Sequence, residues 1–345
     1  MKSFELVHPT SVAAATKLLA AGGDKARLMA GGQDLLGMLK DYIATPDTVI
    51  DLKRISALKG LEYDPSHGLR IGALTTLSEI AENADVRIHF PALSDAAGSV
   101  ASPQIRNVAT IGGNLCQRPR CWYFRNEHIR CLKKGGDRCF AAGDDAENKY
   151  HAILGVGPCH FVHPSDVAPA LVCLGASIVA VGSDGAKRVI PAESFFPVPA
   201  DSLYQETVLH PGEIVTEVRV PASAHAAQSV YLKFREKASF DWALASVAMA
   251  AHVQAGAVRE LRVVLGGVAT IPWRAKSTED ALVGHALDNE AMVAKAAEAA
   301  TDGAEPLAQN AYKIKLVQAV IRRAAKALAS GDRSTWKGGT AQWIA

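Results

Sequence analysis

Four of the six cysteines in this chain fall in one short stretch, among arginines and aromatic residues. The segment 114–139 reads NLCQRPRCWYFRNEHIRCLKKGGDRC, and it contains these four: Cys116, Cys121, Cys131 and Cys139. Cys159 follows after a Gly-Pro pair, and Cys173 lies further along the chain. Thiols gathered in this way can form disulfides, bind zinc or hold an iron–sulfur cluster.

The spacing of the cysteines and the start of the chain bear on these three chemistries. Disulfides persist in oxidising compartments, and the opening MKSFELVHPT lacks an apolar signal core, so we expect no secretory signal on this chain. Zinc sites usually contain a Cys-x2-Cys pair, whereas the gaps here are 4, 9, 7 and 19 residues. An iron–sulfur cluster tolerates wide spacing because loops can supply its thiolates. Spacing alone leaves zinc, a cluster and unligated cysteines open.

The charges around the cysteines favour an anionic group. Seven basic residues lie between Cys116 and Cys139: Arg118, Arg120, Arg125, Arg130, Lys133, Lys134 and Arg138. The same stretch contains only two acidic residues, Glu127 and Asp137. A thiolate-ligated cluster carries net negative charge, which cations and hydrogen-bond donors stabilise. His160 and His163 could instead complete a Cys/His zinc site with Cys159.

The whole-chain composition is that of an ordinary globular protein. The 345 residues are 49% hydrophobic and 21% charged, and 37 basic against 35 acidic residues give a net charge of +2. A chain of this length can bury a large core in two or three domains. The balanced charge gives no reason to expect nucleic acid as a partner. No apolar run reaches the ~18 residues of a membrane-spanning helix, so we expect no membrane span.

Strand and helix patterns alternate along the chain, which predicts an α/β or α+β fold. Strands are expected near 4–9, 48–53, 69–74, 230–237 and 262–270. Helices are expected over 10–23, 75–83, 91–101, 278–287, 289–300 and 310–330. Thr76 and Glu79 have the spacing of a capping box at the start of the second helix.

Two glycine pairs could bring the backbone close to a ligand. They lie in AGGQDLL, 30–36, and in ATIGGNL, 109–115. Consecutive amides without side chains make anion sites, although a lone glycine pair is more often a turn. Neither pair belongs to a G-x-G-x-x-G or a G-x-x-x-x-G-K-[ST] motif. A nucleotide bound here would therefore not be bound as in the usual nicotinamide fold.

These motifs together resemble one family. AGGQDLL, SPQIRNVATIGGNL and HPSDVAPALVCLGA stand in the order of the three signatures of the flavin subunits of molybdenum hydroxylases, which include xanthine dehydrogenase, carbon monoxide dehydrogenase and aldehyde oxidoreductase. The later stretch YLKFREKASFDWALASVAMAA resembles the start of that family's C-terminal domain. Most members lack the cysteine stretch. It resembles an insertion that carries an extra 4Fe–4S cluster in the 4-hydroxybenzoyl-CoA reductase β subunit. The stretch QRPRCWYFRN is more similar to the corresponding insertion in periplasmic-type aldehyde oxidoreductases.

The resemblance implies an α+β chain with a vanillyl-alcohol-oxidase-like (PCMH-like) FAD-binding fold. Two α/β subdomains would make up residues 1–222, at about 1–56 and 57–222, with an iron–sulfur insertion at about 116–160. A sheet-and-helix C-terminal domain would cover 226–330. Residues 331–345 would form an extended tail.

The resemblance also implies a set of FAD contacts: Ala30, Gly31, Gly32, Gln33, Asp34, Leu35, Thr110, Gly112, Gly113, Asn114, Asp166 and Lys233. The glycine loops would receive the phosphates, with Gln33 in place of the family's commoner threonine. Asp166 would bind a ribityl or ribose hydroxyl, although it could also cap the helix that follows it. Lys233 would approach the flavin, but a lysine on a strand is more often simply solvated.

By the same resemblance, the cluster ligands are Cys121, Cys131, Cys139 and Cys159. Cys173 stands in an apolar run typical of a buried free thiol. Cys116 abuts the flavin motif, at a position that is apolar in some relatives, and is the reserve ligand.

The implied function is electron transfer, with no catalytic residue on this chain. Substrate would be oxidised at a molybdenum cofactor on a large subunit. Electrons would pass through 2Fe–2S clusters on a small subunit to FAD here, and then to an external acceptor. The chain would be periplasmic by co-export with a partner that carries the signal, or cytoplasmic. Two other classes stay open: a stand-alone FAD oxidase, and a zinc-stabilised nucleic-acid-binding protein that uses RPRCWYFR as a basic aromatic patch.

Overall fold

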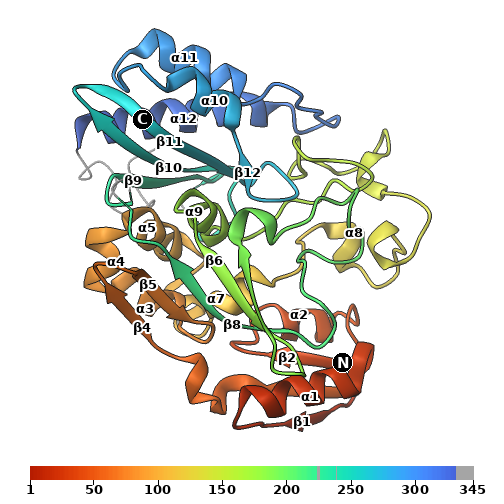
Figure 1. The fold of residues 1–345 in the computed structure, drawn as a ribbon. Helices are drawn as coiled ribbons and strands as arrows, with labels where there is room; N and C mark the ends of the chain where they lie inside the picture. The colour runs from red at the N-terminus through yellow and green to blue at the C-terminus, as the bar shows by residue number, and fades with distance from the viewer. Residues whose placement is uncertain (224–225, 238, 332–345) are drawn as a thin grey trace.

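The computed structural model describes residues 1–223, 226–237 and 239–331, and it stacks three layers along the molecule (Figure 1). The N-terminal layer and the C-terminal domain lie at opposite ends, with a larger middle layer between them. The expected tail, apart from Gly331, lies outside the described residues.

The N-terminal layer is a three-stranded parallel sheet. Its strands are β1 (Glu5–Val7), β3 (Thr48–Asp51) and β2 (Ala26–Met29), in that order. Helix α1 (Val12–Gly22) packs on the sheet, and Ser11 caps it by accepting the Ala14 amide. The glycine loop of residues 30–34 connects β2 to α2 (Leu35–Lys40).

The middle layer is a five-stranded sheet in which every pairing is antiparallel. Its order is β4 (Leu61–Asp64), β5 (Gly68–Gly72), β8 (Ile214–Val220), β6 (Ser177–Val181) and β7 (Lys187–Pro191). The helices of this layer are α3 (Leu77–Glu82), α4 (Ala84–His89), α5 (Pro91–Ser99), α6 (Pro103–Arg106), α7 (Ile111–Leu115) and α9 (Val167–Cys173). The predicted capping box of Thr76 and Glu79 is present at α3.

The C-terminal domain is an antiparallel sheet covered by helices. The strand order is β12 (Trp273–Arg274), β11 (Ala257–Gly266), β10 (Ala245–Gln254) and β9 (Ser229–Phe234). Three helices cover its outer face: α10 (Lys276–Leu282), α11 (Glu290–Ala299) and α12 (Tyr312–Ser330). The sequence did not predict β10. It is contacted by α12 on one side and by α5 and α9 on the other, so seven successive residues are buried and the alternation of a half-exposed strand is lost.

The cysteine segment, residues 116–160, contains no strand. It has one short helix, α8 (Trp122–Arg125), and 3-10 turns at Leu132–Lys134 and Phe140–Ala142. Figure 1 shows it in yellow along one side of the molecule, near α2 and beside the loop that leads to β12. Across the described residues, no helix combines the length and the apolar character needed to cross a bilayer.

Candidate cofactor sites

A cavity of about 1120 Å³ runs between the N-terminal layer, the middle layer and the cysteine segment. Typical small-molecule sites measure roughly 300–1,000 Å³, so this cavity can hold a large cofactor. All twelve residues predicted to contact FAD line it: Ala30, Gly31, Gly32, Gln33, Asp34, Leu35, Thr110, Gly112, Gly113, Asn114, Asp166 and Lys233. The fold therefore gathers in one place residues that lie as far apart in the sequence as Ala30 and Lys233.

Both glycine pairs line the cavity, and close packing leaves no room for a side chain at Gly31 and little at Gly112. A Cβ atom on Gly31 would lie 1.9 Å from the carbonyl oxygen of Val108. A Cβ atom on Gly112 would lie 3.0 Å from both the carbonyl oxygen and the Cβ atom of Ala73. Thr110 fixes the second pair by accepting the Gly113 amide at 3.2 Å. The amides of Gly112 and Gly113 are used within the protein, by the Ala73 carbonyl and the Thr110 hydroxyl, so the amides of the first loop, around Gly31 and Gly32, are the ones that suit an anionic ligand such as a phosphate.

Asp34 is held by the cysteine segment. One carboxylate oxygen accepts the Arg118 amide at 2.8 Å, and the other lies 2.7 Å from Arg125 and 2.9 Å from Arg120. These charge-assisted bonds pin the segment against the first glycine loop. Sequence reasoning missed this role, because nothing in the motif shows that arginines about 85–90 residues away return to it.

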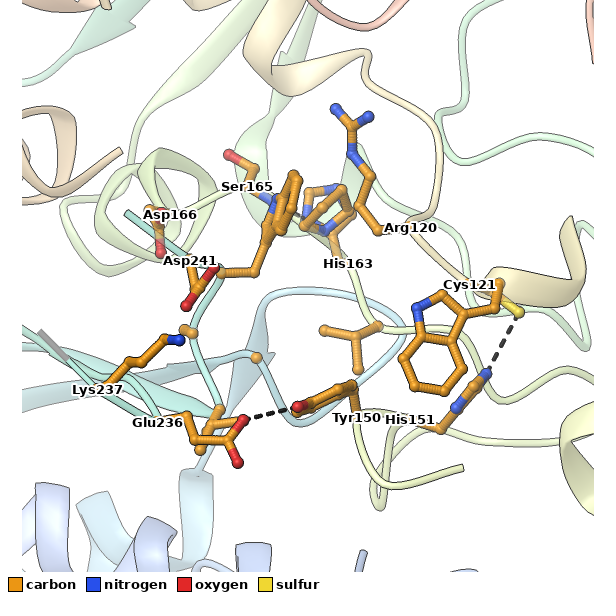
Figure 2. A pocket seen from close by; sticks show the side chains of 17 residues that line it. Arg120, Cys121, Tyr150, His151, His163, Ser165, Asp166, Glu236, Lys237 and Asp241 are labelled. Carbon is orange, nitrogen blue, oxygen red and sulfur yellow. Dashed lines mark hydrogen bonds between the residues drawn. The ribbon is translucent and has the colours of Figure 1, made fainter. Parts of the chain in front are cut away.

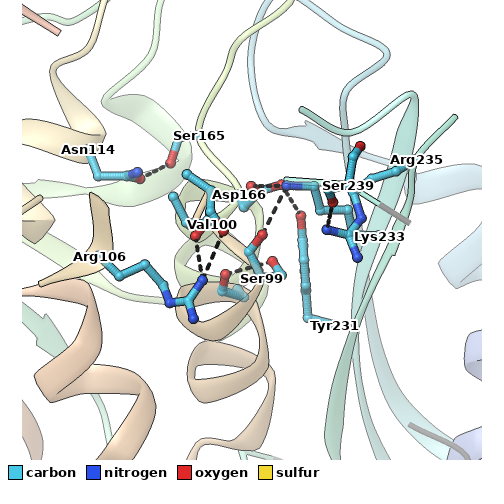
Figure 3. Close-up of polar contacts among 12 residues, drawn as sticks. Ser99, Val100, Arg106, Asn114, Ser165, Asp166, Tyr231, Lys233, Arg235 and Ser239 are labelled. Atoms are coloured by element: carbon cyan, nitrogen blue, oxygen red, sulfur yellow. Dashed lines mark hydrogen bonds and ion pairs between the residues drawn. The ribbon is translucent and has the colours of Figure 1, made fainter. Parts of the chain in front are cut away.

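Asp166 and Lys233 form a buried ion pair at one end of the cavity (Figure 3). Lys233 Nζ lies 2.7 Å from Asp166 Oδ2, and the side chains are only 4% and 6% exposed. Tyr231 donates to Oδ1 of the same carboxylate at 2.6 Å, and Lys233 also donates to the Ser99 carbonyl. Desolvation, followed by the Asp166 charge, raises the pKa of Tyr231 well above its usual value.

Two alternative roles that the sequence allowed, a helix cap for Asp166 and a solvated side chain for Lys233, are wrong. Asp166 stands at the N-cap of α9 but makes no capping bond; the Ser165 hydroxyl accepts the Ala168 amide instead. Lys233 is buried rather than solvated. Tyr231 was missed, although residues two apart on a strand share a face, which places it beside Lys233.

The cysteines divide into a group of four and two isolated thiols. The thiols of Cys139 and Cys159 interact with each other, which lowers the pKa of Cys139 and raises that of Cys159. Cys121 interacts electrostatically with Cys139 and Cys131, and its sulfur lies 3.3 Å from Nε2 of His151. The four predicted ligands therefore lie near one another.

Cys116 and Cys173 stay outside this group. Burial raises the pKa of Cys116 to about 12, with no thiol or cation acting on it, and Cys173 bonds the Arg262 carbonyl in the core. Within the part of the chain that the structure describes, no group of three or more His, Cys, Asp or Glu side chains is arranged to hold a metal ion.

Cations lie near the cysteines, and one of them, Lys133, is buried. Lys133 has a side chain only 1% exposed; it pairs with Glu206 at 2.8 Å and lies over the Phe161 ring. Arg118 pairs with the same carboxylate at 2.5 Å. Lys134 interacts favourably with the thiolate forms of Cys131 and Cys121. Positive charge near a thiol stabilises its thiolate form.

Lys313 joins the cysteine segment to the C-terminal domain, and it provides a pH-dependent test of that junction. Its ammonium group donates to the carbonyls of Tyr150 at 2.9 Å and Gly267 at 2.7 Å, and burial lowers its pKa from 10.5 to about 7. Between these pH values the unfolded chain binds more protons than the folded chain. Stability should therefore increase as the pH rises through this window, by on the order of 4 kcal/mol at most.

We expect Lys313→Met to remove that pH dependence. Urea unfolding at pH 7 and pH 10 should show wild type gaining stability relative to the variant, on top of a pH-independent loss from the two unpaired carbonyls. Lys315→Met, on the exposed side of α12, serves as the matched control and should follow wild type at both pH values. A constant difference between wild type and Lys313→Met at both pH values would contradict the prediction.

Comparison with known proteins fits this geometry. Residues 2–223 match the family described as the FAD binding domain in molybdopterin dehydrogenase, and residues 229–328 match the CO dehydrogenase flavoprotein C-terminal domain. The fold and cavity are thus those of a flavoprotein subunit of an oxidoreductase.

Individual relatives agree with both matches. The aldehyde oxidoreductase FAD-binding subunit PaoB of Escherichia coli is 34% identical over 302 residues, which cover 86% of this chain and 89% of that protein. The carbon monoxide dehydrogenase medium chain of Hydrogenophaga pseudoflava is 31% identical over 94% of this chain and 96% of its own length. A solved CO dehydrogenase from Oligotropha carboxidovorans aligns with a TM-score of 0.74 at 26% identity, covering 95% of this chain and 98% of that one. The chain belongs to the FAD-binding medium subunits of the molybdenum hydroxylase family.

Proposed function

We propose that this chain is the FAD- and 4Fe–4S-containing electron-transfer subunit of a heteromeric molybdenum-dependent aldehyde oxidoreductase. Its partners are a large molybdenum-cofactor subunit, where the aldehyde is oxidised, and a small 2Fe–2S subunit. Electrons arrive from the small subunit and leave to an external acceptor. The observation that carries the proposal is the cavity lined by all the predicted flavin contacts. The 34% identity to an aldehyde oxidoreductase FAD-binding subunit supports the substrate class.

The residues fit FAD. The amides around Gly31 and Gly32 would hold the pyrophosphate, and Asn114 and Asp166 would hold hydroxyl or ring groups. Bound FAD would supply the two-electron carrier of the subunit. The chain's own contribution is to bind the cofactor, to exclude water and to fix the charge of Lys233 beside it. Residues 1–222 would form the FAD-binding domain and 226–330 the C-terminal domain.

The cysteine group fits a cluster in its donor set and its charge. Four thiols lie near one another in a segment made mostly of loops, and Nε2 of His151 lies 3.3 Å from the Cys121 sulfur. Such second-layer donors and the nearby lysines would stabilise the negative charge of a thiolate-bound cluster. A bound cluster would supply a one-electron carrier or a structural clamp.

The test combines an anaerobic absorption spectrum with iron, acid-labile sulfide and flavin assays on the purified chain. We expect flavin together with about four iron and about four sulfide per chain. Cys121→Ser, Cys131→Ser, Cys139→Ser and Cys159→Ser should each lose most of the iron and sulfide. Cys173→Ala, a change in the apolar core, should retain both.

Each other outcome would rule out a part of the proposal. Loss of iron in Cys116→Ser with retention in Cys159→Ser would exchange these two ligands. Flavin without iron in wild type would remove the cluster and leave the flavoprotein. Zinc with neither flavin nor sulfide would replace the whole proposal with the zinc-binding alternative. Turnover of aldehyde by this chain alone would indicate a stand-alone oxidase.

A further inference from the structure

The side-chain amide of Asn114 is held by the hydroxyl group of Ser165 (Figure 3). The hydroxyl donates to Oδ1 of Asn114 at 2.5 Å, and the two residues are only 3% and 8% exposed. Asn114 lies in α7, beside the second glycine pair, and it lines the 1120 Å³ cavity predicted to hold FAD. Ser165 stands next to Asp166 and close to His163 (Figure 2), but its side chain does not line that cavity. Any effect of Ser165 on the flavin must therefore pass through a neighbour.

The Ser165 hydroxyl has one proton to donate, and its other bond decides where that proton goes. Its oxygen accepts the Ala168 amide at 3.0 Å, which caps α9. An accepted bond uses a lone pair, so the proton remains for Oδ1 of Asn114. A reversed amide would place Nδ2, which can only donate, against the hydroxyl. The buried hydroxyl proton would then lose its acceptor, which is costly. The pair thus fixes which end of the amide faces Ser165.

The other end of the amide, Nδ2, is a donor that the protein does not use. It makes no hydrogen bond to any described residue, yet it keeps some accessible surface. Because Asn114 lines the flavin cavity, this donor faces the space that FAD would occupy. A donor directed into a binding site selects a hydrogen-bond acceptor on the ligand.

We propose that Ser165 is a positioning residue for the cofactor, which holds Asn114 so that Nδ2 donates to an acceptor atom of FAD. This inference rests on the proposed function, in which FAD fills the cavity. FAD offers acceptors in its phosphate, hydroxyl and ring carbonyl oxygens. The N3–H group of the flavin ring is a donor, and it would not be placed against Nδ2. His163 supports the arrangement, because its Nδ1 accepts the backbone amide of Ser165 at 3.4 Å.

The test removes FAD from the holoenzyme complex and titrates it back, with binding followed by the quenching of flavin fluorescence. Asn114→Ala removes the donor and should weaken FAD binding about 3- to 15-fold, as expected for one hydrogen bond. Ser165→Ala releases the amide and should weaken binding about 2- to 10-fold. In the Asn114→Ala background, Ser165→Ala should have no further effect on FAD affinity, because it acts through the residue already removed.

Two further variants separate this role from a structural one. Ser11→Ala removes a cap of the same kind, since Ser11 accepts the Ala14 amide at 3.1 Å at the start of α1, and it should leave FAD binding unchanged. Asn114→Asp keeps the size of the side chain and the acceptor for Ser165, but it replaces the donor by an oxygen. It should bind FAD more weakly than Asn114→Ala, because two acceptors would then face each other.

Three results would overturn the proposal. The first is equal FAD affinity of wild type and Ser165→Ala. The second is the same loss from Ser165→Ala in both backgrounds, which would mean that the serine acts through the cap of α9. The third is tighter FAD binding by Asn114→Asp than by Asn114→Ala, which would mean that the ligand presents a donor. Failure of the proposed function is a separate observation: a complex that binds FAD but oxidises no aldehyde contradicts that function, whereas the titrations still decide the role of Ser165.

Discussion

Gly31→Ala should abolish FAD retention while the neighbouring Gly37→Ala leaves it intact. The added methyl group at residue 31 would stand 1.9 Å from the carbonyl oxygen of Val108, which is part of the backbone and cannot rotate away. One of the two glycine loops must therefore move, and the bare amides facing the cavity move with it. We expect a loss of stability of about 3 kcal/mol, similar to overpacking of a core, together with loss of flavin absorbance.

Gly37 is the matched control because it belongs to helix α2 and has open space around its Cβ position. Alanine there should raise the free energy of unfolding by about 0.5–1 kcal/mol, since alanine has the higher helix propensity. The ratio of flavin absorbance to protein absorbance after gel filtration measures FAD retention, and urea unfolding measures stability. Retention of FAD by Gly31→Ala at the wild-type ratio would mean that the first glycine loop does not hold the cofactor.

The sequence predicted those features that depend on a local residue pattern or on a short motif. The glycine loops, the α3 capping box and the long C-terminal helix each depend on residues close together in the chain, and these predictions agree with the structure. Strand β10 was missed because burial on both faces leaves no alternation to detect. The antiparallel middle sheet was not foreseen, because strand direction depends on how β8 returns between β5 and β6 from far along the chain.

Contacts between side chains that are far apart in the sequence could not be predicted either. From the sequence, Asp34 and Asp166 were identified as site residues. Their partners in the fold were not predicted. The arginines on Asp34 and the tyrosine and lysine on Asp166 come from segments about 65–90 residues away, which only the folded chain brings together. His163 was considered only as a zinc ligand. In the fold its Nδ1 accepts the backbone amide of Ser165, a contact that the residue types do not encode.

Asp166→Asn should be among the most destabilising conservative changes in the chain. It leaves the ammonium group of Lys233, 4% exposed, without its counterion, while Tyr231 loses a charged acceptor. Breaking a buried pair by removing one partner typically costs about 3–5 kcal/mol. Asp47→Asn breaks an exposed pair, in which the side chains of Asp47 and Lys2 are 55% and 47% exposed, and it should leave the free energy of unfolding almost unchanged. Urea unfolding of the two variants measures the contrast.

The double variant Asp166→Asn, Lys233→Met separates stability from cofactor binding. Removing both charges leaves no unpaired buried ion, so much of the lost stability should return, because replacing a whole buried pair by groups of similar volume is often nearly neutral. FAD retention should stay below wild type, because both side chains line the flavin cavity and the charge-assisted hydroxyl contact proposed for Asp166 becomes a weaker neutral one. If the double variant folds and binds FAD as tightly as wild type, the ion pair serves only to join α9 to β9, and the cofactor contacts proposed for both residues are wrong.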